Sequence, residues 1–355
     1  MIIGFIKGQN DEKCPITPEL VKKYKGISVD VVAEEGIYES AYFTKENYSD
    51  EIKFEKRSDV IKKSDILFCS SPLEEEEYKL INPEAHFISL LEPYNKPEVI
   101  DEMGKYSFRT FSRDMIPRTT LAQSMDVLSS MASVAGYKAV LKASELLPRY
   151  LPMMITAAGS IKPSKVLVLG AGVAGLQAIA TARRLGAMVE AFDVRRASKE
   201  EVESLGAKFV EVEGAADDKD AGGYAVQQSE EYLKRQQEEV QKRAKNSDII
   251  ITTAQLRGRP APKLILKETV EAMKPGSVIV DLASSTGGNC ELTEDNKTIN
   301  HKGVNIIGNS SLADDMVQDS SILLSNNIFN YAQTMVKEGA IHFDPDNEIL
   351  AKSKI

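Results

Sequence analysis

Short runs of apolar residues alternate with longer segments of mixed polarity along most of the chain. The runs predict strands at residues 2–6, 28–33, 65–69, 86–91, 107–111, 165–169, 188–192, 208–212, 249–253, 277–281 and 304–307. Most of the segments between them predict helices, at residues 58–63, 73–80, 198–205, 227–245, 267–273 and 312–337. Continuous apolar strands that alternate with helices are typical of parallel sheets covered on both faces. The pattern therefore predicts an α/β protein with two doubly wound domains.

The stretch between the two predicted domains has a weaker pattern. Pro117 ends the preceding element, and Thr119 or Thr120 can then cap a helix that runs to about residue 141. A further helical segment is predicted at residues 144–158, although it contains two prolines.

Two other local signals refine the predicted elements. Ser198, with Glu201 three residues later, has the spacing of a capping box at a helix start. Near the end of the chain, residues 341–343 and 348–350 predict the two arms of a short hairpin.

One stretch combines a strand, a glycine-rich turn and a helix in a single unit. The apolar run at residues 165–169 is followed by Gly170, Gly172 and Gly175, and then by helix-forming residues up to Gly186. In a dinucleotide site, the first glycine allows a tight turn, the second lets the backbone approach a pyrophosphate, and the third lets the helix pack on its strand. The stretch predicts a Rossmann-like dinucleotide-binding domain.

Asp193 ends the second strand of this unit, at the distance expected for an acid that binds a ribose diol. A carboxylate there favours NAD(H) over NADP(H), because it repels a 2′-phosphate. Arg195 and Arg196 follow closely, and they either line the adenosine pocket or are solvated.

A polar strip precedes the dinucleotide unit. Gln123, Asp126 and either Ser129 or Ser130 recur at helical spacing and would share one helix face. Spacing alone leaves two readings open, a solvated face and a set of hydrogen-bonding groups for a carboxamide.

Composition narrows the class of protein. The chain has 355 residues and a net charge of −9, which argues against nucleic acid as its main partner. Cys14, Cys69 and Cys290 lack metal-ligand spacing, so we expect buried thiols, a reducing compartment and no metal. We expect Asp217–Asp220, in the acidic loop at 213–223, to be solvated.

The order of the elements predicts a discontinuous architecture. The last long helix would return to the first domain, so that residues 1–130 and 310–355 form one domain and residues 131–309 form the inserted dinucleotide domain. We expect the active site in a cleft between the domains. Tyr224, carried on the hinge glycines Gly222 and Gly223, predicts a lid over the nucleotide.

Several blocks of sequence together resemble a known family. These blocks are Arg118-x4-Gln123-x2-Asp126-x2-Ser129, AGYKAV, VLVLGAGVAGLQAIATARRLGA, FDVR, AGGYA, TTA, GRPAP, MKPGSVIVDLA and GGNCELT. They resemble, in order and over nearly the entire chain, the NAD(H)-binding component, or domain I, of proton-translocating nicotinamide nucleotide transhydrogenase. The resemblance implies hydride transfer between NAD(H) here and NADP(H) on a partner domain.

The resemblance also implies roles for particular residues. Gln123, Asp126 and Ser129 would orient the nicotinamide and its ribose, and Arg118 would reach toward the nucleotide or the facing subunit. The cofactor-binding set that it implies is Gly170, Gly172, Val173, Gly175, Asp193, Val194, Arg195, Gly223, Tyr224, Gln236 and Gln255. The segments Gln255–Arg257 and Ser284–Thr286 depart from the family pattern.

Alanine dehydrogenase shares this fold and is the competing enzyme. Resemblance to it would require an arginine, a lysine, a histidine and an aspartate at places that here read Lys13, Ser70-Ser71, Leu91 and Ser284–Thr286. Amino-acid dehydrogenation needs an acid–base group, whereas hydride transfer between two nicotinamides needs only oriented rings. A third reading is a module that senses NAD(H) without catalysis.

The family resemblance further implies partners and a location. The partners would be an NADP(H)-binding domain, a membrane-spanning domain that moves protons, and a second copy of the chain. We expect the chain to be cytoplasmic, or in an equivalent reducing compartment, and peripheral to the membrane.

Overall fold

A computed structural model describes residues 1–9, 11–212, 230–344 and 346–355. The chain divides into two compact units, Met1–Met131 with Ala313–Ile355, and Ala132–Leu312. We call them unit 1 and unit 2. The predicted lid at Gly223 and Tyr224 and the acidic residues Asp217–Asp220 lie outside the described residues.

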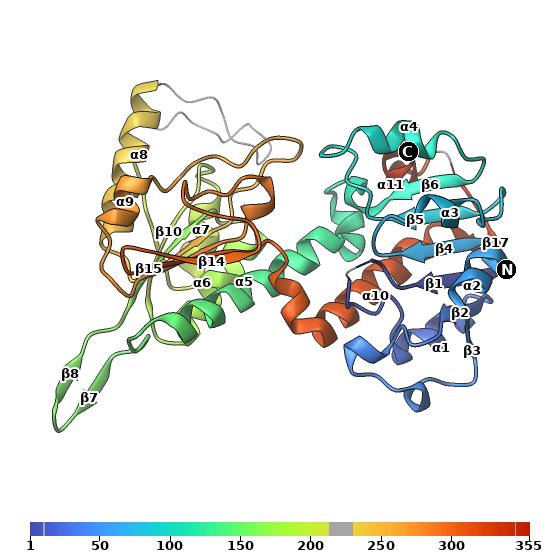
Figure 1. Ribbon diagram of the computed structural model, residues 1–355, viewed down its shortest axis with the longest axis horizontal. Coiled ribbons are helices and arrows are strands. Elements are labelled where there is room, and N and C mark those ends of the chain that lie inside the picture. The colour runs from blue at the N-terminus through green and yellow to red at the C-terminus, as the bar shows by residue number, and fades with distance from the viewer. Residues whose placement is uncertain (10, 213–229, 345) are drawn as a thin grey trace. The chain divides into compact units, whose positions relative to one another are not determined.

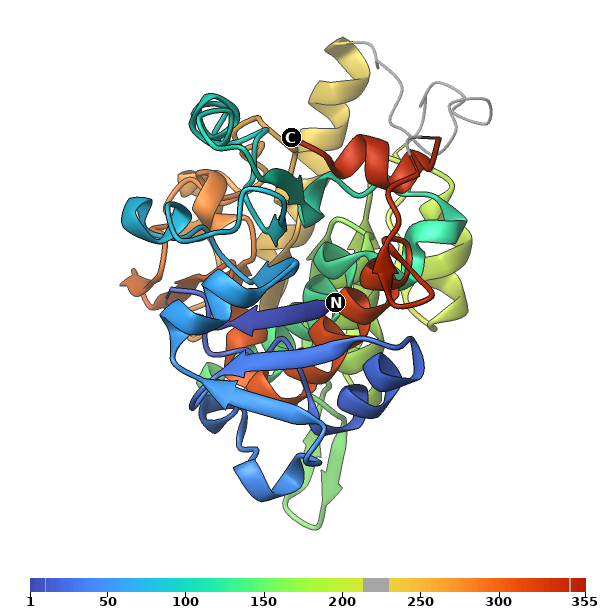
Figure 2. The same cartoon turned by 90° about the vertical axis from the view of Figure 1, so that its right-hand side faces the viewer.

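Unit 1 is built on a parallel sheet in the order β3-β2-β1-β4-β5-β6. Its strands are β1 Ile2–Ile6, β2 Asp30–Glu34, β3 Ile52–Glu55, β4 Ile66–Cys69, β5 His86–Ser89 and β6 Arg109–Ser112. Its helices are α1 Pro18–Gly26, α2 Arg57–Lys63, α3 Glu75–Tyr78, α4 Glu98–Met103, α10 Val317–Gln333 and α11 Glu348–Ser353, with short 3₁₀ turns at Glu39–Ala41, Lys45–Asn47, Arg113–Met115 and Thr120–Met125. A further 3₁₀ turn, Leu312–Met316, begins at the last residue of unit 2 and leads into α10. Figure 2 shows β1, β2 and β3 side by side.

Both faces of this sheet are covered by apolar side chains. α1 and α10 pack on one face through residues such as Leu20 and Ile328. α2, α3 and α4 cover the other face, where Val60 and Met103 are buried. Because α10 lies after unit 2 in the sequence, unit 1 is complete only when the end of the chain returns to it.

Unit 2 has a second sheet, in the order β11-β10-β9-β12-β13-β15-β14, parallel except for β14. Its strands are β9 Lys165–Leu169, β10 Met188–Phe192, β11 Lys208–Phe209, β12 Ile249–Thr252, β13 Val278–Asp281, β14 Lys297–His301 and β15 Val304–Gly308. Its helices are α6 Val173–Arg184, α7 Ser198–Ser204, α8 Glu230–Lys245 and α9 Lys267–Glu271, with a 3₁₀ turn at Ser284–Thr286. α5, Val127–Leu146, begins in unit 1 and continues into unit 2.

The fold class is confirmed, because both sheets are Rossmann-like with helices on both faces. Two strands at sheet edges were not predicted, β3 and β14. Both have mixed or exposed side chains rather than an apolar run, because an edge strand buries less of its surface.

The predicted helical segment at 144–158 is wrong. α5 ends at Leu146, and β7 Met154–Thr156 pairs with β8 Gly159–Ile161 in an antiparallel hairpin (Figure 1). Pro148 and Pro152 explain the change, because proline cannot continue the hydrogen bonding of a helix.

Three further local predictions are wrong. Ser198 is the first residue of α7, it is buried, and no side-chain cap is formed, so there is no capping box. The end of the chain forms the strand pair β16 Val336–Lys337 and β17 Ala340–Ile341 followed by α11, in place of the predicted hairpin. Residues 119–141 do not form one helix either, because a 3₁₀ turn at Thr120–Met125 precedes α5.

Candidate functional site

The glycine turn begins where β9 ends. Gly170 has φ +101°, a conformation that favours glycine, and its N–H donates to the carbonyl of Phe192 at 2.8 Å. A Cβ on Gly170 would lie 2.4 Å from Oγ1 of Thr253. The turn therefore requires glycine at this position for its backbone angle and for the space available.

The third glycine of the motif fixes α6 against the turn. A Cβ on Gly175 would lie 1.8 Å from the carbonyl oxygen of Gly170. α5, the helix that precedes β9 in the sequence and packs on α6, makes a similarly close contact, because a Cβ on its Gly136 would lie 2.1 Å from the carbonyl oxygen of Ala174. These contacts hold the first turn of α6 in place.

Gly172 differs from the other two glycines. It precedes the first residue of α6, and apart from its two chain neighbours no atom of the described residues lies within 4 Å of the position that a Cβ would take. A ligand can thus approach the backbone at the helix N-terminus, where the helix dipole and free N–H groups favour an anion. Val173, the first helical residue, is exposed beside it. The turn fits the pyrophosphate of a dinucleotide.

Asp193, which follows β10, is bound to the turn and to a nearby arginine. Its Oδ2 accepts a hydrogen bond from the N–H of Ala171 at 2.7 Å. Arg195 donates to the same carboxylate through its backbone N–H, Nε and Nη2, at 2.8, 3.0 and 3.1 Å. The side-chain hydrogen bonds to Asp193, together with its negative charge, raise the pKa of the Arg195 guanidinium. Val194 lies between the two residues and is exposed.

A buried asparagine shapes the loop after β12, next to the glycine turn. The side-chain amide of Asn289 accepts from the N–H of Ala254 at 3.0 Å and donates to the carbonyls of Ala254 and Pro262, at 2.8 and 2.9 Å. Thr253 Oγ1 donates to the carbonyl of Gly170 at 3.1 Å, which ties this loop to the turn. Gln255 follows and is exposed.

Asp281, at the end of β13, in turn fixes Asn289. It is fully buried, and its Oδ2 accepts from the N–H of Asn289 at 2.7 Å and from Oγ1 of Thr293 at 2.7 Å. Asp281 lies in the block MKPGSVIVDLA, and Asn289 and Thr293 lie in GGNCELT, but the sequence pattern predicted no role for these side chains. The signal that could have found them is a pair of polar residues next to an apolar strand and a glycine pair.

Of the remaining residues that were predicted to bind the dinucleotide, only Gln236 lies within the described part of the chain. Gln236 lies on α8 with 9% of its surface exposed. Gly223 and Tyr224 are outside the described residues.

In unit 1, the polar strip of Gln123, Asp126 and Ser129 has a local geometry different from the predicted helix face. Asp126 precedes α5, its Oδ1 accepts from the N–H of Ser129 at 3.0 Å, and its Oδ2 accepts from Ser129 Oγ at 2.6 Å. Asp126 is therefore the N-cap of α5. Gln123 belongs to the preceding 3₁₀ turn, so the three residues do not share one α-helical face.

The 3₁₀ turn that carries Gln123 is held by α10. Asn327 and Asn330 donate from Nδ2 to the carbonyl of Ser124, at 2.8 and 3.0 Å. Gln123 and Arg118 are exposed. The turn is thus positioned by the segment that returns from the end of the chain, while Gln123 on the turn stays exposed.

The carboxyl edge of the unit 1 sheet carries charged groups of its own. Lys13 pairs with Asp11 at 2.8 Å and with Asp314, and although burial opposes its charge, these carboxylates raise the pKa of Lys13. Arg113 is buried, which lowers its pKa, and its Nη2 donates to the carbonyl of Cys69 at 3.4 Å. The sequence pattern around Arg113 did not predict that this arginine is buried.

The cysteines are buried, as predicted. Burial raises the pKa of Cys14, Cys69 and Cys290 to about 11 each. In the described part of the chain, no three or more His, Cys, Asp and Glu side chains cluster in a way that could hold a metal ion. Within the same residues, none of the helices has the length and hydrophobicity that crossing a bilayer requires.

Two Rossmann-like sheets, and a glycine turn with an acid bound to it, define a nucleotide-binding protein of the doubly wound α/β class. Residues 7–135 match the N-terminal domain of the alanine dehydrogenase/PNT family model, and residues 139–355 match its C-terminal domain. A relative from Rickettsia prowazekii, named as the first part of NAD(P) transhydrogenase subunit alpha, is 41% identical over 96% of this chain and 90% of its own length. The chain belongs to the alanine dehydrogenase/PNT family, among the alpha subunits of NAD(P) transhydrogenase.

Solved structures agree with this placement. A transhydrogenase from Sinorhizobium meliloti superposes with a TM-score of 0.89 at 39% identity, covering 99% of this chain and 97% of that one. An L-alanine dehydrogenase superposes with a TM-score of 0.77 at 20% identity, covering 100% of this chain and 94% of that one. The second likeness shows the shared fold alone.

Proposed function

We propose that this chain binds NAD(H) in unit 2 and exchanges a hydride directly with NADP(H) on a partner domain. A membrane-spanning partner would couple this exchange to proton translocation, with the present chain on the cytoplasmic side. The observation that carries the proposal is the turn at Gly170–Gly175 with Asp193 bound to it, in a chain of the transhydrogenase alpha-subunit family.

In this proposal, unit 2 holds the nucleotide. The N-terminus of α6 at Gly172 and Val173 would bind the pyrophosphate, Asp193 would bind the adenosine ribose, and Arg195 would line the adenosine pocket beside it. Gln236 and Gln255 would contact the nucleotide. NAD(H), when bound, supplies the nicotinamide ring that carries or accepts the hydride.

The residues of unit 1 would orient the reacting ring. Asp126 and Ser129 are already joined by two hydrogen bonds, so their positions are fixed before a nucleotide arrives. Gln123 would bind the carboxamide, and Arg118 would reach toward the nucleotide or the partner. Proton transfer by a side chain is not required, because a hydride moves between two nicotinamides without one.

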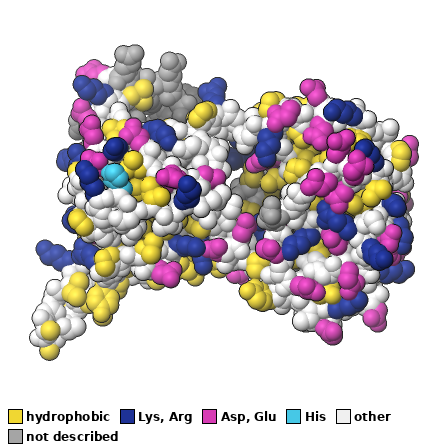
Figure 3. All heavy atoms as spheres, in the orientation of Figure 1, with side chains coloured by type: hydrophobic (Ala, Val, Ile, Leu, Met, Phe, Trp, Pro, Cys, Tyr) yellow, Lys and Arg dark blue, Asp and Glu magenta, His cyan; other side chains and the backbone are white. Residues whose placement is uncertain are grey.

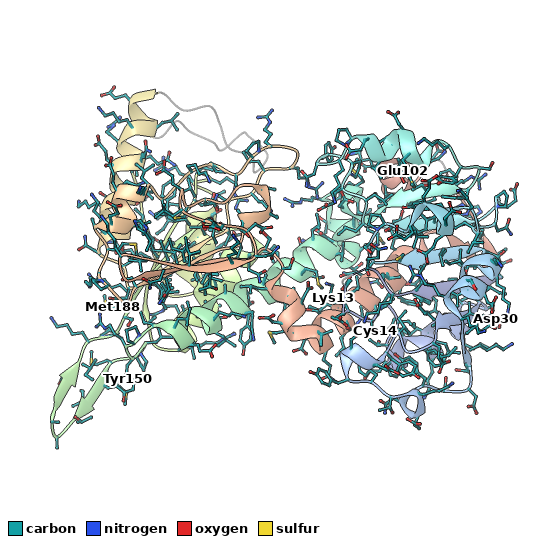
Figure 4. All side chains as sticks on the ribbon, in the orientation of Figure 1. Lys13, Cys14, Asp30, Glu102, Tyr150 and Met188 are labelled. Atoms are coloured by element: carbon teal, nitrogen blue, oxygen red, sulfur yellow. The ribbon has the colours of Figure 1, made fainter. Side chains whose placement is uncertain are left out.

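A second copy of the chain is part of the proposal. The hairpin β7–β8 is exposed at all six of its residues, and a two-stranded hairpin alone is only marginally stable in water. Apolar side chains gather on it (Figure 3), and Tyr150 and Met188 lie at its base (Figure 4). An apolar surface of this kind supports an interface with a second copy.

The proposal is tested by a mixing experiment. The purified chain is combined with the NADP(H)-binding domain of a transhydrogenase, NADPH and an oxidised acetylpyridine analogue of NAD. Reduction of the analogue is expected only when both proteins are present. Lack of turnover in a mixture that binds both nucleotides would refute the proposal.

A parallel assay addresses amino-acid dehydrogenation. The chain is given pyruvate, ammonium and NADH, and no oxidation of NADH is expected. The structure supports this expectation, because Lys13 is already paired with Asp11 and Asp314. Oxidation of NADH in this assay would restore the dehydrogenase alternative.

A further inference from the structure

The carboxylate of Asp193 is surrounded by donors of the protein itself. Oδ1 accepts from the backbone N–H and from Nε of Arg195, and Oδ2 accepts from the N–H of Ala171 and from Nη2 of Arg195. A carboxylate offers about four acceptor positions. All of them are therefore taken in the structure, by four N–H groups.

These four hydrogen bonds are not equally easy to exchange. The N–H groups of Ala171 and Arg195 belong to the backbone, and Ala171 is part of the glycine turn and fully buried. The guanidinium of Arg195 lies at the end of a flexible side chain with 35% of its surface exposed, whereas the Asp193 side chain is only 7% exposed. A ribose diol that binds Asp193 must therefore replace Nε and Nη2 of Arg195.

A displaced guanidinium would remain beside the ribose, because the backbone of Arg195 stays bound to Asp193. This is also where the 2′-phosphate of NADP(H) would lie, since the 2′-hydroxyl is one of the two groups that Asp193 binds. Guanidinium groups bind phosphate through paired hydrogen bonds. Asp193 alone would reject the 2′-phosphate, and the neighbouring Arg195 offsets that rejection.

We propose that Arg195 is the specificity-determining residue of the nucleotide site, because it competes with the ribose diol for Asp193 and offers its guanidinium to a 2′-phosphate. The proposal rests on the proposed binding of NAD(H) by unit 2. Arg195 would make the site discriminate less strongly against NADP(H) than Asp193 alone would.

Arg196 provides a matched control. It carries the same charge on the next residue, but its Nη2 lies 4.0 Å from Glu211, and its side chain is 56% exposed. Arg196→Ala therefore removes one positive charge from the same region and leaves the Asp193 pair intact. Arg195→Lys is a second test variant, because it keeps the charge and loses the planar fork of donors.

The experiment titrates the full chain with NADH and with NADPH and follows nucleotide fluorescence. Arg195→Ala is expected to bind NADH at least as tightly as the wild type does. It is expected to bind NADPH at least about tenfold more weakly than the wild type does, because it lacks a charged hydrogen bond to the 2′-phosphate. Arg195→Lys is expected to bind NADPH more tightly than Arg195→Ala does. Arg196→Ala is expected to leave the ratio of the two affinities unchanged.

The two ways of failing are distinct. If the wild type binds NADH and the affinity ratio of Arg195→Ala equals that of the wild type, the role of Arg195 is refuted and the proposed function stands. The same holds if Arg196→Ala shifts the ratio as much as Arg195→Ala. If the folded wild type binds neither nucleotide, the proposed function is refuted, and the role of Arg195 is refuted with it.

Discussion

The carboxylate of Asp126 accepts two hydrogen bonds from Ser129, one from its backbone N–H at 3.0 Å and one from its hydroxyl at 2.6 Å. The pair caps α5 and also forms part of the proposed catalytic set. One carboxylate thus has a structural role that can be separated from its proposed functional role.

Asp126→Asn separates the two roles. Asparagine also caps helices well, so the free energy of unfolding should change by less than about 0.5 kcal/mol, whereas Asp126→Ala should lose about 1 kcal/mol. Hydride transfer by Asp126→Asn should fall at least about tenfold while NADH binding stays near that of the wild type. Denaturant titration, NADH titration and the transfer assay measure the three quantities. Equal losses in binding and transfer would favour a plain binding or sensing role.

Gly172 and Gly175 form a second matched pair. The Cβ of an alanine at 172 would meet no atom of the described residues within 4 Å, apart from its chain neighbours, whereas alanine at 175 would place its Cβ 1.8 Å from the carbonyl oxygen of Gly170. Gly172→Ala should keep the thermal midpoint of the wild type and weaken NADH binding. Gly175→Ala should lower both the thermal midpoint and the affinity for NADH. Its free energy of unfolding should fall by about 1–3 kcal/mol, the usual cost of overpacking. Unchanged NADH binding by Gly172→Ala would contradict a pyrophosphate at this backbone.

The hairpin β7–β8 gives a prediction about assembly. Ile155 is 75% exposed on β7, so Ile155→Asp should not disturb the fold of unit 2. The variant should shift the chain from dimer to monomer in sedimentation experiments, because a charge at an apolar interface opposes its burial. Thr156→Ser on the same strand is the control and should leave the mass unchanged. A wild type that sediments as a monomer would contradict the proposed second copy.

The glycine turn and Asp193 could be predicted from the sequence because each depends on neighbouring residues. Gly170, Gly172 and Gly175 are constrained by a turn of a few residues, and spacing alone placed Asp193 at the end of the next strand. What spacing could not predict is that Arg195 binds both oxygens of Asp193, since this depends on where a long side chain points.

Other parts of the site depend on distant residues and were not predictable. Asn289 holds Ala254 across 35 residues of sequence, and Asn327 holds Ser124 across 203. The helical spacing of Gln123, Asp126 and Ser129 suggested one helix face, but the chain changes from a 3₁₀ turn to an α-helix between them. Residue spacing identified these candidates but gave the wrong local geometry.

The buried His86 should make the free energy of unfolding depend on pH. It is 1% exposed and stacks on Phe111, and burial, with the nearby charges of Arg109 and Lys354, lowers its pKa to about 4 from an ordinary 6.5. The unfolded chain then binds a proton that the folded chain does not, so this contribution is complete above pH 6.5 and is lost as the pH falls toward 4.

The free energy of unfolding should therefore fall between pH 7 and pH 4 by an amount that includes roughly 1–3 kcal/mol from His86. His86→Gln removes the titrating group, and the fall in its free energy of unfolding over this range should be smaller by that amount. Denaturant titrations at several pH values make the comparison. Identical pH dependence in the two proteins would show that His86 is not the group responsible.

The central claim is that a hydride passes directly between two nicotinamides, and isotope transfer tests it most directly. NADPH carrying deuterium at the transferred C4 position is mixed with the chain, the NADP(H)-binding partner and the oxidised acetylpyridine analogue of NAD. Mass spectrometry of the reduced analogue should show the deuterium retained in full, because direct transfer leaves no step for exchange with water. Loss of the label to solvent, or no reduction although both nucleotides bind, would contradict the account.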